Sequence, residues 1–465
     1  MFTIYSLNGL RRKFNISPTQ TVVISFAVII IIGAILLNLP NASNNGRSIG
    51  FINALFTATS ATCVTGLVVV DTATHWTIFG KVVIISLIQI GGLGIMTFST
   101  MLALLIGRKI TLKERLLIQE SFNQFDLEGM VRLTKNIIIT TFAIELAGAL
   151  VFATVFVPQF GWERGLAYGL FHGISSFCNA GFDLMGAHTG PFSSFTSYVN
   201  NPIININTML LIIIGGLGFS VWIDCYKAFK KRSISCLSLH SKVVLTMTVG
   251  LILFGAVFIF IMEINNPATI KNLPWSGKIL ASFFQSVSPR TAGYNTLDMG
   301  SLTMSTSFLT IVLMFIGGSP GSTAGGIKTG TAGILFFTVL SVIKGKDSTE
   351  IFDKRLPKYL VYRAVSVVLI SFSLVIFATM VLSIAEVPYN NTDFMTLLFE
   401  ATSAFGTVGL TMNYSPNLTP AGRVIIVLCM FAGRVGPLSL ILALANNAHK
   451  NKGHIKYPED KIMVG

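Results

Sequence analysis

Long blocks of apolar residues alternate with short polar segments along the whole chain. Several blocks reach about 18 residues or more with few charges, a length typical of membrane-spanning rather than core helices. The pattern predicts an all-α polytopic membrane protein with eight transmembrane helices. The predicted crossings are residues 21–39, 77–107, 133–158, 203–226, 241–264, 305–343, 359–386 and 418–446.

A short motif between the crossings occurs four times. The stretch from Phe56 to Leu67 is identical at seven of twelve positions to the stretch from Phe399 to Leu410. Two weaker copies begin at Phe171 and Phe283 and keep the same ten-residue step to a glycine. These motif glycines, Gly66, Gly181, Gly293 and Gly409, are separated by 115, 112 and 116 residues.

A second glycine motif follows each copy after 24 to 34 residues, at 91–94, 215–218, 317–321 and 433–436. Chance does not readily produce two ordered motifs four times over, so the sequence predicts four related repeats. We place these repeats at 1–115, 116–235, 236–350 and 351–465, the last including a cytoplasmic tail.

Each repeat contains a long apolar helix, a stretch of about 12 residues ending at the motif glycine, and a second apolar helix. A helix of about 12 residues rises only about 18 Å and cannot cross a hydrocarbon core of about 30 Å. The stretch must therefore enter and return. Each repeat is predicted to be an M1-P-M2 unit (helix, re-entrant pore loop, helix), and the four units surround a pseudo-fourfold central pore.

Charge supports this topology. Hydrophobic residues make up 52% of the chain and charged residues 11%, which argues against a soluble enzyme. The 33 Lys and Arg exceed the 19 Asp and Glu, but 24 of the basic residues lie before the first helix, between repeats or in the tail. This bias predicts cytoplasmic termini and pore loops that enter from outside, rather than nucleic-acid binding.

Four irregular loops inside a bilayer are tolerated only if they are buried in protein or line a water-filled cavity. Rings of backbone carbonyls around a shared axis can replace the hydration shell of a cation. Glycine suits such loops because it adopts the positive φ that turns carbonyls toward the axis. The alternative interpretation, close helix packing at small residues, is favoured for the second glycine motif. The sequence has no catalytic constellation and no set of metal ligands.

With these motifs, the chain resembles the Trk/Ktr/HKT superfamily of cation transporters over nearly its whole length. Eight crossings without an extra helix pair most resemble the membrane subunits of bacterial Ktr potassium uptake systems. The resemblance implies K⁺ as the transported ion, held by the backbone carbonyls of Thr65, Ala180, Ala292 and Val408. The implied filter residues are Cys63, Val64, Thr65, Gly66, Cys178, Asn179, Ala180, Gly181, Arg290, Thr291, Ala292, Gly293, Gly406, Thr407, Val408 and Gly409.

A run of small and polar residues from Gly317 to Gly330 interrupts the second helix of the third repeat. It is not a Walker A motif, because one extra residue separates its last motif glycine from Lys328. The resemblance implies an intramembrane gating loop here, touched by an arginine on the last helix. The gate residues are Gly317, Gly318, Ser319, Pro320, Gly321, Ser322, Thr323, Ala324, Gly325, Gly326, Lys328 and Arg434.

Two further features concern charge near the filter. Arg290 is expected to point away from the axis, with Glu400 as a candidate partner, because an unpaired cation there repels K⁺. Asp71, Asp183 and Asp298 follow their motif glycines closely and either concentrate cations at the outer mouth or are ordinary solvated loop charges.

The resemblance also implies a homodimer in the bacterial plasma membrane and a cytosolic nucleotide-binding ring of the KtrA type. Membrane lipids are an alternative occupant of the basic inner face. No cofactor is expected in this chain, and Na⁺ as an activator is left open. The alternative function is a secondary transporter of an organic solute, which usually has inverted repeats, whereas all four units here run the same way.

Overall fold

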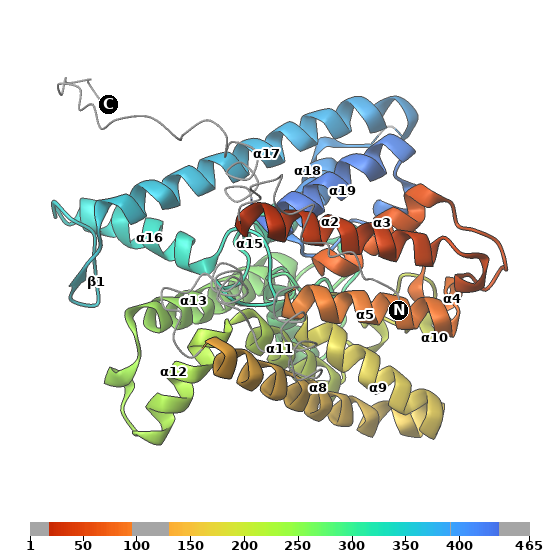
Figure 1. Cartoon of the computed structure of the whole chain (residues 1–465), viewed down its shortest axis with the longest axis horizontal. Coiled ribbons are helices and arrows are strands. Elements are labelled where there is room, and N and C mark those ends of the chain that lie inside the picture. Colours follow the sequence, from red (N-terminus) through yellow and green to blue (C-terminus); the bar gives the residue numbers. More distant parts are fainter. Residues whose placement is uncertain (1–17, 95–129, 391, 437–465) are drawn as a thin grey trace, which may run out of the picture.

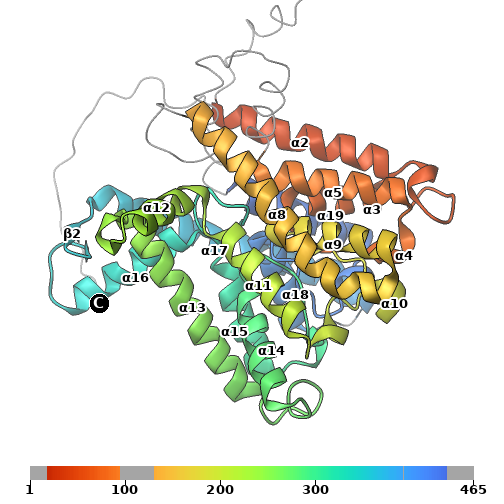
Figure 2. The same ribbon diagram turned by 90° about the horizontal axis from the view of Figure 1, so that it is seen from below.

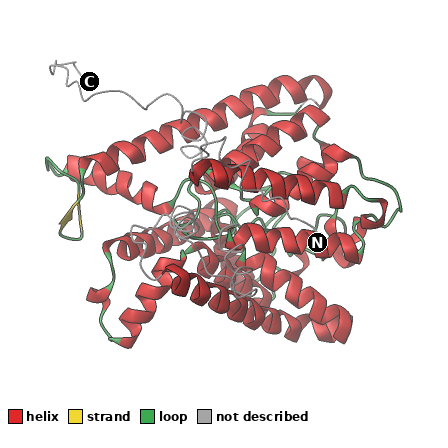
Figure 3. Ribbon diagram, in the orientation of Figure 1, coloured by secondary structure: helices red, strands yellow, loops and turns green. Residues whose placement is uncertain are grey.

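The computed structural model describes residues 18–94, 130–390 and 392–436, and these ranges are helical almost throughout (Figures 1 and 3). The strands within them form one small hairpin, in which β1 (Glu350–Ile351) pairs antiparallel with β2 (Lys354–Arg355). The predicted all-helical fold is therefore confirmed.

Each of the four predicted repeats begins with a long apolar helix. Ile31, Ile32 and Ile35 of the first one are about half exposed, as expected of side chains that face lipid. By length and composition all four can cross a membrane. They are α2 (Pro18–Leu37), α8 (Met130–Phe160), α13 (Leu239–Glu263) and α17 (Lys358–Asn390).

A shorter helix packs against the long helix of the same repeat. These pore helices have 13 or 16 residues, so they rise only about 20–24 Å and stop inside the molecule. They are α3 (Phe51–Cys63), α9 (Trp162–Phe177), α14 (Trp275–Val287) and α18 (Phe394–Gly406).

The third helix of each repeat is shorter than predicted. Three of the four end within the second glycine motif, where Gly94, Gly218 and Gly436 have φ of 81°, 89° and 91°, and the helix of the third repeat ends just before its motif. A residue with positive φ ends a helix, which explains the early stop. These helices are α5 (Ile78–Leu93), α11 (Pro202–Gly216), α15 (Met304–Phe315) and α19 (Pro420–Val435).

The predicted continuous helices 203–226 and 305–343 are therefore wrong. α11 is followed by α12 (Phe219–Lys230) after a bend of 102°. α15 is followed by a loop and then by α16 (Thr329–Ile343). Within the described ranges four helices, and this bent pair as a fifth unit, are long and apolar enough to span a membrane.

Parts of the predicted helices 77–107 and 418–446 lie outside the described residues, as do the boundary between the first two repeats, the tail and most of the basic segment 108–135. Different short helices lie at the two ends of the molecule. The short helices α4 (Thr72–His75) and α10 (Gly186–Thr189) lie at one end, and α12 lies toward the other (Figures 1 and 2).

Candidate functional site

All four pore helices lead into the same unusual backbone path. The second residue before each motif glycine is left-handed, with φ of 58° at Val64, 60° at Asn179, 73° at Thr291 and 50° at Thr407. Branched residues adopt this conformation at a cost of about 1–3 kcal/mol and only where their surroundings impose it. The four loops thus share one backbone geometry despite their different side chains.

The motif glycines form a closed ring. A Cβ built on Gly66 would lie 2.5 Å from the carbonyl oxygen of Ala180 in the next repeat. The same relationship joins Gly181 to Ala292, Gly293 to Val408, and Gly409 back to Thr65. The glycine φ values are 95°, 66°, 76° and 93° in chain order. Any side chain in this ring would therefore clash with a neighbouring carbonyl and strain the backbone.

The carbonyl groups of the ring have no hydrogen-bond partner among the described residues. Within the described ranges, no hydrogen bond to the carbonyl oxygens of Thr65, Ala180, Ala292 or Val408 is formed. Buried backbone carbonyls are nearly always paired, so four unpaired ones in a ring indicate a place for a bound species. Carbonyl oxygens alone favour a cation.

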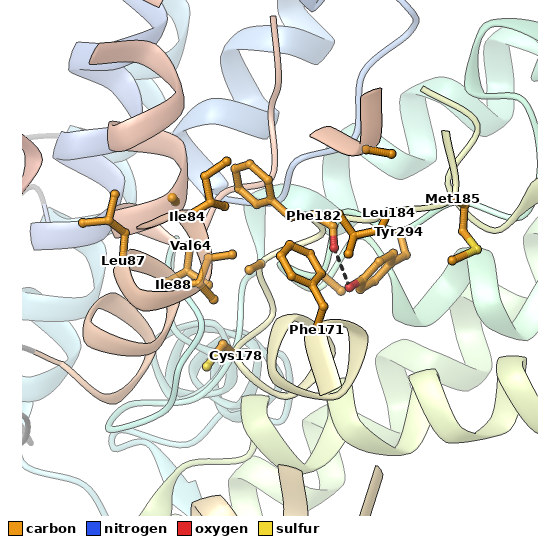
Figure 4. Close-up of a cluster of buried hydrophobic side chains, with 14 of the residues drawn as sticks. Val64, Ile84, Leu87, Ile88, Phe171, Cys178, Phe182, Leu184, Met185 and Tyr294 are labelled. Carbon is orange, nitrogen blue, oxygen red and sulfur yellow. Dashed lines mark hydrogen bonds between the residues drawn. The ribbon is translucent and has the colours of Figure 1, made fainter. Parts of the chain in front are cut away.

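Side chains hold the loops from behind. The Gly66 N–H donates to Ser60 Oγ at 3.0 Å, and the Gly409 N–H donates to Ser403 Oγ at 3.1 Å. The Tyr294 hydroxyl donates to the Phe182 carbonyl at 3.0 Å and so joins the loops of the second and third repeats (Figure 4). These bonds fix the backbone through groups other than the ring carbonyls.

A cavity of about 480 Å³ lies against the ring. All four motif glycines line it, together with Asp71, Asp183 and Asp298. Of the two interpretations of these acids, the lining favours a role at the mouth over ordinary loop charges. Asp71 and Asp298 also cap short helices, through the Thr74 N–H and the Gly300 N–H respectively.

Asp183 and Asp298, which line this cavity, have pKa values shifted in opposite directions. Burial raises the pKa of Asp183 to about 7 against a hydrogen bond from the Met185 N–H, and nearby Asp71 adds to the rise. Burial also raises the pKa of Asp298, but hydrogen bonds from Ser301 and Asn413 outweigh it and hold the pKa below its usual range. The mouth therefore gains negative charge as pH rises through neutrality.

The loop between α15 and α16, residues 316–328, lies against the filter loops. A Cβ on Gly325 would overlap Thr407 Oγ1, and one on Gly317 would lie 3.3 Å from Thr291 Cγ2. The Gly317 N–H donates to the Ile327 carbonyl at 2.9 Å and closes the neck of the loop. The predicted gate residues 317–326 thus lie beside two of the loops that carry the motif glycines.

Arg434 contacts this loop from α19. Its guanidinium donates to the carbonyl of Thr323 and to that of Gly91 at the end of α5. Lys328 Nζ donates to the Ala324 carbonyl at 2.6 Å within the loop. Sequence reasoning pointed to the Arg434 contact but missed the link to α5.

Arg290 turns toward α13, where it donates weakly to the Thr248 carbonyl at 3.4 Å and to Thr248 Oγ1 at 3.3 Å. Glu400 is not its partner, and that prediction is wrong. Glu400 instead accepts from Ser415 Oγ at 2.7 Å and from Thr411 Oγ1. These hydrogen bonds brace the segment that follows its own filter loop.

The second glycine motif packs closely. A Cβ on Gly91, Gly215 or Gly433 would overlap the carbonyl oxygen of Thr62, Phe177 or Phe405, respectively. Each of these carbonyls belongs to the last turn of a pore helix or its end. The favoured interpretation of this motif, close packing, agrees with these contacts.

Sequence reasoning missed several buried acids. Glu145 of α8 accepts from Gln89 Nε2 of α5 at 3.0 Å, beside the thiol of Cys178. Glu263 and Glu386, near the ends of α13 and α17, accept from the N-capping residues Thr303 and Thr419. In the sequence each of these acids lies within or at the end of a long apolar block, and an acid in that position indicates a buried, hydrogen-bonded carboxylate.

Four pore helices that converge on a ring of unpaired carbonyls, inside an all-helical membrane fold, define a cation-translocating membrane protein. Comparison with known proteins agrees: the family described as "TrkH: Cation transport protein" matches residues 9–452. The chain belongs to this family, and the predicted resemblance is confirmed. The prediction of a transporter rather than an enzyme is confirmed with it.

Curated relatives cover nearly the whole chain. It is 42% identical to the Ktr system potassium uptake protein B of Bacillus subtilis, covering 97% of each. It is 39% identical to the potassium/sodium uptake protein NtpJ of Enterococcus hirae, covering 98% of this chain and 99% of that protein. The crystal structure of the potassium transporter TrkH from Vibrio parahaemolyticus has the same fold, with a TM-score of 0.69 over 92% of this chain and 85% of that one at 16% identity.

Proposed function

We propose that this chain is the potassium-translocating membrane subunit of a Ktr-type uptake system, as the sequence predicts. The observation that carries the proposal is the closed ring of Gly66, Gly181, Gly293 and Gly409 with its four unpaired carbonyls. The names of the relatives, potassium uptake protein B and potassium/sodium uptake protein, support K⁺ as the ion.

In this account a hydrated K⁺ enters the cavity beside Asp71 and Asp298, whose charges raise the local cation concentration. It then exchanges water for the carbonyls of Thr65, Ala180, Ala292 and Val408. The C-terminal ends of the four pore helices add negative dipoles at the inner side. One glycine per loop provides few coordination layers, so discrimination against Na⁺ is modest.

The loop of residues 317–326 acts as the gate beneath the filter, and Arg434 holds it closed. Support comes from the contacts of this loop with two filter loops and with the guanidinium of Arg434. Burying an unpaired guanidinium inside a membrane protein costs free energy, and the hydrogen bonds that the carbonyls accept from Arg434 offset this cost. Moving the loop requires breaking these charge-assisted bonds.

The same proposal includes eight crossings with both termini in the cytoplasm, four M1-P-M2 repeats around a pseudo-fourfold pore, and a homodimer in the bacterial plasma membrane. A cytosolic nucleotide-binding ring of the KtrA type would dock on the inner loops. Na⁺ as an activator is part of this proposal, and the name of one relative, a potassium/sodium uptake protein, supports it.

The test is potassium uptake in a host that lacks its own potassium systems. The chain, alone or with a KtrA-type partner, is compared with Gly293→Ser and with Gly250→Ser. Gly250 lies in α13 with nothing within 4 Å of its Cβ position, so it is a matched control. Rescue by the wild type and the control, with weakened affinity in Gly293→Ser, is expected. Membrane insertion without any rescue would instead favour an organic-solute carrier.

A further inference from the structure

We propose that α12 is an interfacial helix that binds anionic phospholipid headgroups of the inner leaflet and transmits their binding to the loop of residues 317–326. The gating part of this inference rests on the proposed function. The binding part rests only on the surface of α12 and on its orientation.

One face of α12 is aromatic and exposed. Tyr226 and Phe229, three residues apart, share a helix face and are 69% and 83% exposed. Ile234, just beyond the helix, is 79% exposed. Trp222, four residues before Tyr226, anchors the start of this face through a hydrogen bond to the Ile214 carbonyl at 2.9 Å. Large exposed aromatic side chains on a short helix are typical of a membrane interface.

The same helix end carries a basic cluster of Lys227, Lys230, Lys231 and Arg232, all exposed. Within the described ranges none of the four forms an ion pair. The acid of α12, Asp224, accepts from Ser241 Oγ at 2.7 Å near the start of α13. Against the effect of burial, the charge of nearby Lys227 helps to lower the pKa of Asp224, although the two form no ion pair. The surface therefore joins unpaired positive charge to an apolar stripe, which complements an anionic headgroup and its acyl chains.

The orientation of α12 fits the plane of the membrane. It leaves α11 at 102°, so α12 lies nearly parallel to the bilayer surface when α11 points along the bilayer normal. It also lies toward the opposite end of the molecule from α4, which borders the outer cavity (Figure 2). The basic cluster is thereby placed at the inner leaflet, as its charge requires.

The bend between α11 and α12 is bonded to the gating loop. The Phe219 N–H donates to the Gly321 carbonyl at 2.9 Å, and the Ser319 N–H donates to the Gly216 carbonyl at 2.9 Å. At Gly218 a Cβ would lie 2.6 Å from the Pro320 carbonyl oxygen. Any tilt of α12 must therefore move this loop or break these bonds.

Among the occupants of such a surface, lipid is favoured over a soluble partner. Half-embedded aromatic side chains on a helix in the membrane plane meet acyl chains before they meet a cytosolic protein. The β1–β2 hairpin provides a contrast, because Lys354 and Arg355 are exposed there on a short strand with one exposed aromatic side chain, Phe352, in the turn beside them, and not along an aromatic helix face.

Binding is tested with the full chain in detergent, titrated with phosphatidylglycerol or with phosphatidylcholine and followed by native mass spectrometry. We expect preference for phosphatidylglycerol, and an affinity about fivefold lower for each of the four charges changed to Gln. Lys354→Gln with Arg355→Gln is the control and should keep the preference. Equal binding of both lipids, or an unchanged preference when all four charges are removed, overturns the proposal. The proposal is also overturned if the variant without the four charges no longer binds a KtrA-type ring but keeps its preference for phosphatidylglycerol.

Coupling is tested by ⁸⁶Rb⁺ flux into proteoliposomes with and without phosphatidylglycerol. Wild-type flux should depend on this lipid, the four-charge variant should lose that dependence, and Arg434→Ala should conduct in both mixtures. Lipid dependence that survives in the four-charge variant refutes the coupling. Absence of flux in every variant and mixture refutes the proposed function instead, and the binding result stands apart from it.

Discussion

Gly409 lies against the carbonyl oxygen of Thr65 and so closes a ring between the last repeat and the first. Its left-handed φ of 93° and this close approach leave no room for a side chain. The two residues lie at opposite ends of the chain, so their contact depends on the correct packing of all four repeats.

Gly409→Ala should lower discrimination between K⁺ and Na⁺. The added methyl must displace the Thr65 carbonyl, which is a ring oxygen, and we expect a loss of about tenfold or more, corresponding to about 1.4 kcal/mol. Competition between Na⁺ and ⁸⁶Rb⁺ in proteoliposome uptake measures it. Gly250→Ala, which meets no neighbour within 4 Å, is the control, and equal losses in both variants would contradict the ring.

Arg434→Ala should raise ion flux. Removal of the guanidinium frees the Thr323 carbonyl and releases the loop from α19, so flux without the cytosolic partner should increase by about tenfold or more. Arg423, on the same helix but bonded to Asn53 of α3, is the matched control. Flux that stays at the wild-type level in Arg434→Ala would argue against a gate held by this side chain.

Uptake should depend on external pH through Asp183. A carboxyl whose pKa is raised to about 7 is ionised above that pH and neutral below it. Acidification from about pH 8 to pH 6 therefore removes a negative charge from the mouth and should weaken apparent K⁺ affinity severalfold. Asp183→Asn should remove most of this dependence and resemble the acidic wild type at every pH. If Asp183→Asn leaves the pH profile unchanged, another group is responsible for the pH dependence.

Glu386→Ala should destabilise the fourth repeat. The carboxylate accepts from the Thr419 N–H at 3.0 Å and from the Tyr414 hydroxyl at 2.8 Å, and truncation leaves these donors without their partner. The expected loss is about 3 kcal/mol. Denaturant unfolding in detergent measures it, against exposed Glu163→Ala, which should change stability by less than about 0.5 kcal/mol. Equal stability of both variants would refute the bracing role.

The sequence predicted the four loops and their glycines because spacing and φ requirements are local properties. It also predicted close packing at Gly91, Gly215 and Gly433, since small residues in apolar helices have few other uses. It does not predict that α11 ends at Gly216, because a glycine motif inside an apolar run does not distinguish a bend from a packing site.

Side-chain partners were the least predictable part. Charge alone suggests Glu400 as the partner of Arg290, yet Arg290 donates to Thr248 on α13 and Glu400 accepts from Ser415 within its own repeat. The Glu145–Gln89 pair joins residues 56 apart in the chain, and only the packing of α5 against its neighbours brings them together. Such choices depend on helix rotation, which the pattern of apolar residues does not determine.

The central claim is that the carbonyls of Thr65, Ala180, Ala292 and Val408 hold the transported ion. The most direct test is an anomalous diffraction map of crystals grown in Rb⁺, compared with crystals grown in Na⁺ alone. The account predicts a Rb⁺ peak on the axis within the ring, lost in Gly409→Ala and retained in Gly250→Ala. Well-diffracting Rb⁺ crystals with no peak in the ring, or with a peak only elsewhere, would contradict it.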